Sequence, residues 1–294
     1  MDIQTPPAKE PTTIRYRLKR DAEDFVTRWQ GWWQSKRFRL GTYAGGALFL
    51  LLLLFWALFA RNLPDAEALI EYESPLPTVV RDINGQPFHS YARERRVQLE
   101  YADFPKTLVH AYLAAEDKTF FSHGGIDYPG IVSAIFDNIF SDKRSRGAST
   151  ITQQVAKNLL LTNEYSYTRK VKEAILAKRI ESALTKQQIL SLYLNEIALG
   201  RQSFGVEAAA QAYFGKSVDK LLLHEMAFLA ILPKAPERYG RAKNAKLAMS
   251  RRNWVLGEMR ANGWITDAQL ATARAQPLGL MTQRRTGYKN IGGY

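Results

Sequence analysis

The sequence predicts a mainly α-helical protein with one small β-hairpin and one transmembrane helix near its N-terminus. Three observations predict this fold class. An uncharged apolar run covers residues 41–60, alternating residues flank an Asn84-Gly85 turn signal, and a 3.6-residue period prevails from Pro105 onward. A chain of 294 residues without internal repeats is expected to hold one sizeable folded domain with appendages.

The apolar run at residues 41–60 predicts a membrane span. It reads GTYAGGALFLLLLLFWALFA and contains no charged residue. A helix of this length covers the hydrocarbon core of a bilayer, ~30 Å at ~1.5 Å per residue. Residues 1–40 carry nine Lys or Arg against five Asp or Glu, so the positive-inside rule predicts a cytoplasmic N-terminus. We expect an uncleaved single span with residues 61–294 outside. A cleaved signal peptide is the alternative, but the basic region is too long for one and no small-x-small site follows.

Composition divides the rest of the chain. Residues 1–25, with three Pro residues and mixed charge, are predicted to be disordered. The expected parts are a cytoplasmic tail at 1–40, the transmembrane helix at 41–60, a connector with the β-hairpin at 61–104, the main helical domain at 105–245 and a C-terminal helical segment at 246–294.

The chain is strongly basic. Forty-one Lys and Arg against 28 Asp and Glu give a net charge of +13, which indicates an anionic partner. Because most of the chain is expected outside the cytoplasm, anionic lipid head groups and a phosphate-bearing substrate explain this charge better than nucleic acid does. The sequence contains no Cys, which excludes disulfides, thiol chemistry and Cys-type metal sites.

Glu116 is the first candidate catalytic residue. Helical spacing places it on one stripe with Val109, Tyr112 and Leu113, where an apolar residue would face the core. Burial disfavours the charged carboxylate, which raises its pKa and suits it to proton transfer near neutrality. From periodicity alone, a buried Glu held by a structural salt bridge is an equal alternative.

A predicted helix start within residues 146–158 is the second candidate. Thr150 and Gln153 fit a capping box that follows a basic loop. A helix N-terminus with Ser, Thr and unpaired N–H groups suits an anion, and Lys157 lies on the same face as Gln153 and Gln154. The alternative is an ordinary capped helix with a solvated Lys, because capping boxes are common.

Glu173 is a second acid in an apolar stripe. It shares that stripe with Leu176, and Arg169, Lys170 and Lys172 cluster around it. The alternative is a solvated helix face whose charges pair at i,i+4 spacing.

Five motifs follow one another along the chain. They are Glu-Asp-x-x-Phe-x-x-His-x-Gly at 116–125, Gly-x-Ser-Thr-Ile-Thr-Gln-Gln-x-x-Lys-Asn at 147–158, Arg-Lys-x-x-Glu at 169–173, Ile-Leu-x-x-Tyr-Leu-Asn at 189–195 and a stretch from Glu225 to Tyr239. Together they resemble the peptidoglycan glycosyltransferase domain of family 51, found in monofunctional transglycosylases and in class A penicillin-binding proteins. The resemblance covers roughly residues 65–278.

This resemblance implies a lysozyme-like helical fold and an inverting glycosyltransferase. Glu116 would be the general base that deprotonates the 4-hydroxyl of lipid II, whose oxygen attacks the anomeric carbon of the growing chain. Undecaprenyl pyrophosphate would leave, and the new bond would be β-1,4. Glu173 would orient groups or stabilise charge around the donor. Ser149, Lys157, Arg169 and Lys172 would contact pyrophosphate.

The resemblance also implies further site residues and partners. The substrate-binding set is completed by Thr150, Gln153, Gln154 and Asn158, and the residues expected to support the motifs are Asp117, Phe120, His123, Gly125 and Asn195. A structural role is favoured for His123, since no second metal ligand stands at ligand spacing. No cofactor is required, although Mg²⁺ or Mn²⁺ bridging the substrate pyrophosphate is compatible with the reaction. The expected partners are lipid II, the lipid-linked glycan, the bacterial inner membrane and proteins of cell-wall synthesis or division, with the catalytic domain periplasmic or otherwise extracytoplasmic.

The sequence departs from the family pattern at a few positions. Tyr165 stands where family members often carry Arg, and Ala198 replaces a usual aromatic residue. Ser217-Val218-Asp219-Lys220 fits one transpeptidase pattern, but no Ser-x-Asn or Lys-Thr-Gly accompanies it. We therefore expect residues 246–294 to be a linker toward an absent transpeptidase domain in a truncated bifunctional protein, with a naturally short relative as the alternative.

Two other functions compete with glycan polymerisation. A lysozyme-like fold could cleave glycan with Glu116 as general acid, although a hydrolase of polymeric glycan has no pyrophosphate to bind. A non-catalytic membrane scaffold of the cell-wall machinery is the second rival, and retention of both Glu116 and Glu173 argues against it.

Overall fold

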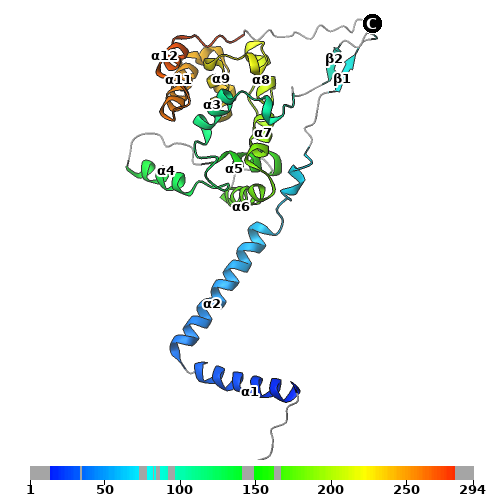
Figure 1. Cartoon of the computed structure of the whole chain (residues 1–294), viewed down its shortest axis with the longest axis vertical. Helices are drawn as coiled ribbons and strands as arrows, with labels where there is room; N and C mark the ends of the chain where they lie inside the picture. Colours follow the sequence, from blue (N-terminus) through cyan, green and yellow to red (C-terminus); the bar gives the residue numbers. More distant parts are fainter. Residues whose placement is uncertain are drawn as a thin grey trace, which may run out of the picture. The chain divides into compact units, whose positions relative to one another are not determined.

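The computed structural model describes residues 14–33, 35–72, 78–81, 83, 87–91, 97–140, 149–161 and 167–281. The chain divides into two compact units, Met1–Asn62 and Leu63–Tyr294. Each unit is built mainly from helices, which confirms the predicted fold class (Figure 1).

The first unit consists of two long helices. Helix α1 covers Ile14–Trp33, and α2 covers Lys36–Phe55 and continues as the π-helical turn η1, Trp56–Ala60. Among the described residues, 36–60 form the one helix long and apolar enough to cross a membrane, and none of it is buried within the protein. The predicted span at 41–60 lies within this helix, which begins about one turn earlier.

The predicted disorder of residues 1–25 is wrong from residue 14 onward. Residues 14–33 form α1, because apolar residues recur along this segment at helical spacing and no Pro interrupts it after Pro11. Composition averaged over the tail concealed that periodicity. Residues 1–13 lie outside the described part of the chain.

The small β element is present in the second unit. Strands β1, Thr78–Arg81, and β2, Pro87–Tyr91, pair antiparallel with Thr78 opposite Tyr91 and a register shift between Val80 and Arg81. The predicted hairpin is therefore confirmed as a strand pair, whereas its Asn84-Gly85 turn lies outside the described residues.

The rest of the second unit is helical. Its α-helices are α3 (Lys106–Glu116), α4 (Tyr128–Phe140), α5 (Ile151–Val155), α6 (Tyr167–Ala183), α7 (Lys186–Glu196), α8 (Val206–Phe214), α9 (Leu223–Leu229), α10 (Pro236–Tyr239), α11 (Ala245–Ala261) and α12 (Asp267–Ala275). A π-helical turn, η4 (Ala156–Leu160), follows α5. Short 3₁₀ turns are η2 (Glu67–Leu69), η3 (Tyr101–Asp103), η5 (Val218–Lys220), η6 (Leu232–Lys234) and η7 (Ala242–Asn244).

These helices form two groups around a continuous hydrophobic core. Helix α5 packs on α6 and α7, while α3 packs on α9 and α11. Figure 1 shows α4, α5 and α6 at one end of the unit and α3, α8, α9, α11 and α12 at the other. The rings of Tyr112 on α3 and Tyr193 on α7 meet edge to face at 6.1 Å, and the Tyr112 hydroxyl donates to the Leu229 carbonyl. The two groups of helices are therefore joined through the hydrophobic core by contacts of Tyr112 on α3.

Arg252 links α11 to the segment that follows α12. Its guanidinium is fully buried and donates to the carbonyls of Gln276 at 2.7 Å, Arg274 at 3.2 Å and Pro277 at 3.3 Å. It also donates to the Asn253 side chain. The last carbonyls of a helix have no partner within it, and Arg252 supplies hydrogen bonds to such groups at the end of α12.

Replacement of Arg252 by Met should destabilise the second unit by about 2–4 kcal/mol, because three carbonyls at the end of α12 lose their donor at once. Unfolding by guanidinium, followed through Trp fluorescence, measures this change. The matched control is Arg260→Met, which removes an exposed ion pair with Asp267 and should change the unfolding midpoint little. Equal effects of the two substitutions would contradict a role for Arg252 in stability.

Candidate active site

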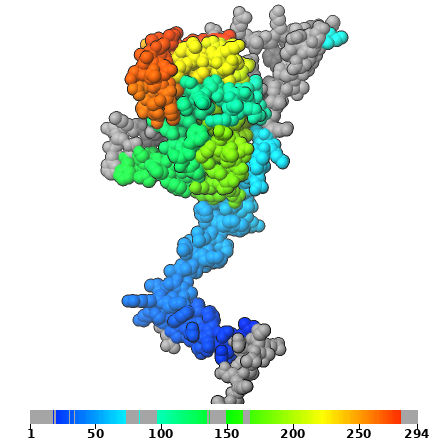
Figure 2. Space-filling view, viewed as in Figure 1, coloured from blue at the N-terminus to red at the C-terminus, as the bar shows by residue number. Residues whose placement is uncertain are grey.

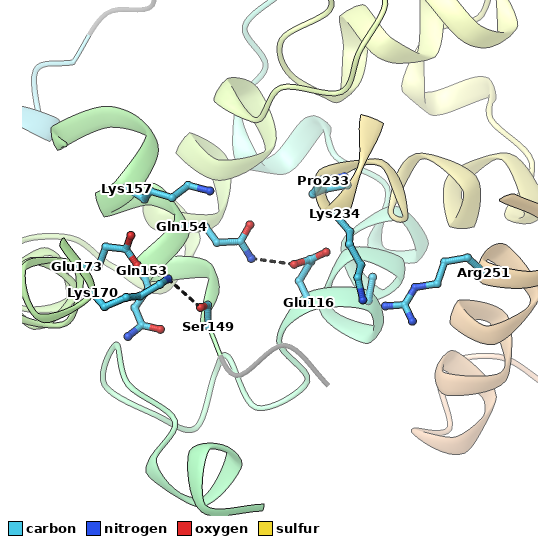
Figure 3. A pocket seen from close by; sticks show the side chains of 11 residues that line it. Glu116, Ser149, Gln153, Gln154, Lys157, Lys170, Glu173, Pro233, Lys234 and Arg251 are labelled. Atoms are coloured by element: carbon cyan, nitrogen blue, oxygen red, sulfur yellow. Dashed lines mark hydrogen bonds and ion pairs between the residues drawn. The ribbon is translucent and has the colours of Figure 1, made fainter. Parts of the chain in front are cut away.

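The candidate active site is a cavity of about 210 Å³ at the C-terminal end of α3. It is enclosed by side chains from α3, the start of α5, η4, α6, η6 and α11 (Figure 3). The lining residues are Ala115, Glu116, Ser149, Gln153, Gln154, Lys157, Lys170, Glu173, Pro233, Lys234 and Arg251. Four cationic groups and two carboxylates thus share one small cavity.

Glu116 occupies the centre of this cavity. It is the last residue of α3, one turn beyond the buried Tyr112, and its carboxylate accepts a hydrogen bond of 2.8 Å from the Gln154 side-chain amide. Burial raises the pKa of Glu116 above its ordinary value, against the hydrogen bond from Gln154 and the nearby positive charges, which lower it. The partner of the Glu116 carboxylate is thus an amide. Among the described residues, no salt bridge holds Glu116, contrary to the structural alternative.

Asp117 fixes the turn that follows Glu116. Its buried carboxylate accepts the Ile151 backbone N–H at 2.9 Å and lies 3.0 Å from Nε2 of His123. The Gly125 N–H donates to Nδ1 of the same ring, so Nε2 carries the proton that is donated to Asp117. These contacts give His123 a partner within the fold and attach the turn to the start of α5.

The capping box at the start of α5 is confirmed. The Gln153 N–H donates to the Thr150 hydroxyl oxygen at 3.1 Å, and the Thr150 N–H donates to the Gln153 side chain at 2.9 Å. The Thr150 hydroxyl donates in turn to the Gly125 carbonyl. Two of the first N–H groups, those of Ile151 and Gln153, are therefore occupied by the protein's own side chains. Fewer backbone N–H groups are therefore available to an anion at this helix start than the sequence predicted.

Glu173 lies on the far wall from α3 and is 1% exposed. Its carboxylate is 2.6 Å from Nζ of Lys170 and 3.1 Å from Nε of Arg169, both on the same helix. Lys170 also donates to the Ser149 hydroxyl at 3.4 Å. Two cations thus compensate one buried acid, and Lys170 extends from that pair toward the cavity.

Lys157 adds a further positive charge beside this pair. It lies on η4, half-buried, and burial lowers its pKa while the carboxylates of Glu173 and Glu116 oppose that shift. Its ammonium lines the cavity, as does that of Lys170. We call Lys157 and Lys170 the α6-side cations.

Lys234 and Arg251 form a second cationic group, which was not predicted from the sequence. Figure 3 shows them on the other side of Glu116 from the α6-side cations. Arg251 stacks on the Trp254 ring at 3.7 Å. We call Lys234 and Arg251 the α11-side cations. Lys234 lies within the fifth motif, so the sequence could have indicated it as a site residue. Arg251 lies in the segment that was expected to be a linker, where the sequence offered no such indication.

The remaining predicted residues lie around the cavity rather than in it. Thr150 lines an adjoining cavity of about 340 Å³ that also reaches Glu116. Arg169 contacts Glu173, Lys172 is half-buried outside the cavity lining, and Asn158 is exposed. Phe120 is buried beneath the Lys186 ammonium. Tyr165 lies outside the described residues.

Asn195, which was expected to support the motifs, is a buried polar residue at the end of α7. Its side-chain amide donates to the Leu99 carbonyl at 2.9 Å and accepts the Leu99 N–H at 3.0 Å. This pair of bonds holds the segment before α3 against the end of α7.

The cavity suits an anion better than a metal ion bound by the protein alone. Within the described ranges, no three His, Asp or Glu side chains gather as metal ligands. A cation that arrived with a phosphate group would meet the carboxylates of Glu116 and Glu173.

The chain is similar in sequence to one protein family and to several known proteins. Residues 84–260 match the family model described as transglycosylase. The chain is 45% identical over 225 residues to penicillin-binding protein 1A of Rickettsia felis, covering 76% of this chain and 28% of that protein. It is 43% identical over 217 residues to penicillin-binding protein 1A of Escherichia coli, covering 74% and 26%. The crystal structure of penicillin-binding protein 1A from Haemophilus influenzae is similar with a TM-score of 0.41 and 27% identity, covering 71% and 22%. The chain thus spans less than a third of the length of each.

Replacement of Asp117 by Ala should lower the free energy of unfolding by about 2–3 kcal/mol, because the buried Ile151 N–H and the His123 ring lose their shared acceptor. Chemical unfolding of the full chain in detergent measures the change. Asp267→Ala is the matched control, since its carboxylate pairs with Arg260 at the surface. A loss no larger than that of the control would show that Asp117 does not hold the turn.

Proposed function

Because the chain belongs to the transglycosylase family, we propose that it polymerises lipid II into β-1,4 glycan strands with release of undecaprenyl pyrophosphate. The observation that supports this proposal most directly is the position of Glu116. A carboxylate of raised pKa lies between two cationic groups that can each take a phosphate.

Glu116 acts as the general base in the proposed reaction. Its carboxylate takes the proton of the acceptor 4-hydroxyl while that oxygen attacks the anomeric carbon of the donor. The bond from this carbon to the pyrophosphate oxygen breaks, and the pyrophosphate leaves with the electron pair, so the configuration inverts. Gln154 holds the carboxylate by its 2.8 Å hydrogen bond and leaves the acid without a compensating ion pair. The raised pKa makes the ionised carboxylate a stronger base.

The α6-side cations stabilise the leaving pyrophosphate. Negative charge grows on this group as the glycosidic bond breaks, and positive groups already in place lower the barrier. Glu173 holds Lys170 at 2.6 Å and Arg169 at 3.1 Å, so its role is to position these side chains. Ser149 supports Lys170 from the other wall.

The α11-side cations bind the pyrophosphate of the acceptor. Both reactants in this chemistry are lipid-borne pyrophosphates, and one base must be shared between them. Lys234 and Arg251 lie across Glu116 from Lys157 and Lys170, which gives each reactant its own positive partner (Figure 3). This arrangement also separates two anions that would repel one another.

The substrates place the reaction at a membrane surface. Helix 36–60 has the length and composition of a membrane anchor, and the basic residues around it favour a cytoplasmic N-terminus with the second unit in the periplasm. Glycan cleavage explains the site less well, because polymeric glycan carries no phosphate for four cationic side chains to bind.

The first test compares the parent protein with Glu116→Gln. Both are purified in detergent and incubated with labelled lipid II, and the products are resolved by size. The parent should give long glycan, and the variant should be slower by about 10²–10⁴-fold because it lacks the base. The amide keeps the size of the side chain and so preserves the cavity.

The pH profile is the control for that role. Activity of the parent should fall as the pH decreases through the raised pKa of Glu116, since protonation removes the base. The residual rate of Glu116→Gln should lack this acid limb. A folded parent that makes no polymer would refute catalysis by this chain and leave the scaffold function.

A second test separates Lys170 from Lys172. Lys170→Met should lower kcat/KM by about 10–100-fold, the loss of one charge-assisted contact to the leaving group. Lys172→Met should stay within about fivefold of the parent, because Lys172 lies outside the cavity lining. Circular dichroism controls for folding of both variants. The reverse order of effects would favour the sequence-based assignment of Lys172 to the pyrophosphate.

A further inference from the structure

Helix α1 carries a long apolar face that the proposed reaction does not use. Leu18, Ala22, Phe25, Trp29 and Trp32 follow one another at spacings of four and three residues, which places them on one side of the helix. We call these five residues the α1 stripe. Leu18 is 65% exposed, Phe25 62% and Trp32 55%, so the stripe is not packed into the protein.

The opposite face of α1 is polar. Glu23, Asp24 and Thr27 lie there, and all three are exposed. The Thr27 hydroxyl donates back to the carbonyls of Glu23 and Asp24 within the helix. A helix with one apolar stripe and one charged face suits the boundary between lipid and water, and it is too polar to cross the bilayer.

The α1 stripe continues into the start of the membrane helix. The Trp29 ring meets the Phe38 ring edge to face at 5.2 Å, and Trp32 lies 5.8 Å from the same ring. Trp33 also contacts Tyr43 of α2 at 5.9 Å. In Figure 2 the side chains of α1 and of the start of α2 form one continuous blue surface. Trp and Tyr concentrate at the depth of the lipid head groups, so this cluster marks that level.

We propose that α1 lies along the membrane surface with the α1 stripe buried among the lipid head groups and the upper acyl chains. This inference rests on the proposed anchoring by helix 36–60. The occupant is the bilayer itself, because the stripe is joined to the membrane helix through the aromatic cluster and only two residues separate α1 from α2. The helix then acts as a second contact with lipid on the side where the chain enters the membrane.

Single-cysteine labelling of the full chain tests this placement. The sequence contains no Cys, so each introduced thiol is the only one present. Leu18→Cys and Phe25→Cys report on the stripe, and Glu23→Cys and Thr27→Cys report on the polar face. Each variant is placed in nanodiscs of phosphatidylethanolamine and phosphatidylglycerol at one copy per disc, and its rate of reaction with a membrane-impermeant maleimide is measured.

The two stripe positions should react at least about tenfold more slowly than the two polar positions. A bimane group attached at position 25 should also be quenched by lipids that carry a spin label near the head group, while one at position 27 should not. Equal rates at all four positions would overturn the proposal. Protection that appears only with two copies per disc, or only after another protein is added, would overturn it in favour of a protein interface.

Leu51→Cys separates this inference from the anchoring on which it rests. Leu51 lies within helix 36–60 and should be protected wherever that helix spans the bilayer. Protection at position 51 with rapid labelling at positions 18 and 25 would refute the proposed surface position of α1 and leave the membrane anchor intact. Rapid labelling at position 51 refutes the anchor and the α1 proposal together.

Discussion

The hydrogen-bonded carboxylate of Asp117 determines how the two sides of the active cavity meet. It accepts the first N–H of α5 and the proton of His123, while Gly125 receives the Thr150 hydroxyl from the same helix start. Glu116 precedes Asp117 directly, and Gln154 lies on α5, whose first N–H group donates to Asp117. The 2.8 Å contact between Glu116 and Gln154 therefore depends on a hydrogen bond that involves neither of these two side chains. Loss of the Asp117 contact with Ile151 would remove one of the hydrogen bonds that fix the distance between Glu116 and the start of α5.

The electrostatics of the cavity combine opposite demands. In the proposed reaction, a base that works near neutral pH requires a carboxyl group whose charged form is disfavoured, whereas a leaving pyrophosphate requires strong positive charge. Burial at the end of α3 supplies the first, and Lys157, Lys170, Lys234 and Arg251 supply the second. A cation paired directly with Glu116 would lower the pKa of this carboxyl group and so oppose the effect of burial. The amide of Gln154 occupies that contact instead, so the carboxylate is held without being neutralised.

Local patterns in the sequence predicted much of this protein, because its main features are encoded over a few residues. The apolar helix 36–60, the strand pair, the capping box of Thr150 and the stripe that contains Glu116 each depend on a spacing of residues that the sequence shows directly. The α11-side cations were missed because Lys234 and Arg251 come together only through the packing of α11 on α3 and α9. The sequence analysis assigned Lys172 rather than Lys170 to the pyrophosphate, because residue spacing alone does not show which face of α6 turns toward Ser149. The start of α1 was misjudged because Pro residues before residue 14 dominated the composition.

Adjacent arginines on α11 serve unrelated neighbours. Arg251 reaches the cavity, whereas Arg252 is buried against the carbonyls at the end of α12. An α-helix turns by about 100° for each residue, so the two side chains point in different directions. One orientation of α11 about its axis places Arg251 at the cavity and Arg252 at the end of α12. Insertion or deletion of one residue before this pair would rotate both guanidiniums away from their partners. The length of α11 ahead of residue 251 is thus constrained by two separate sets of contacts.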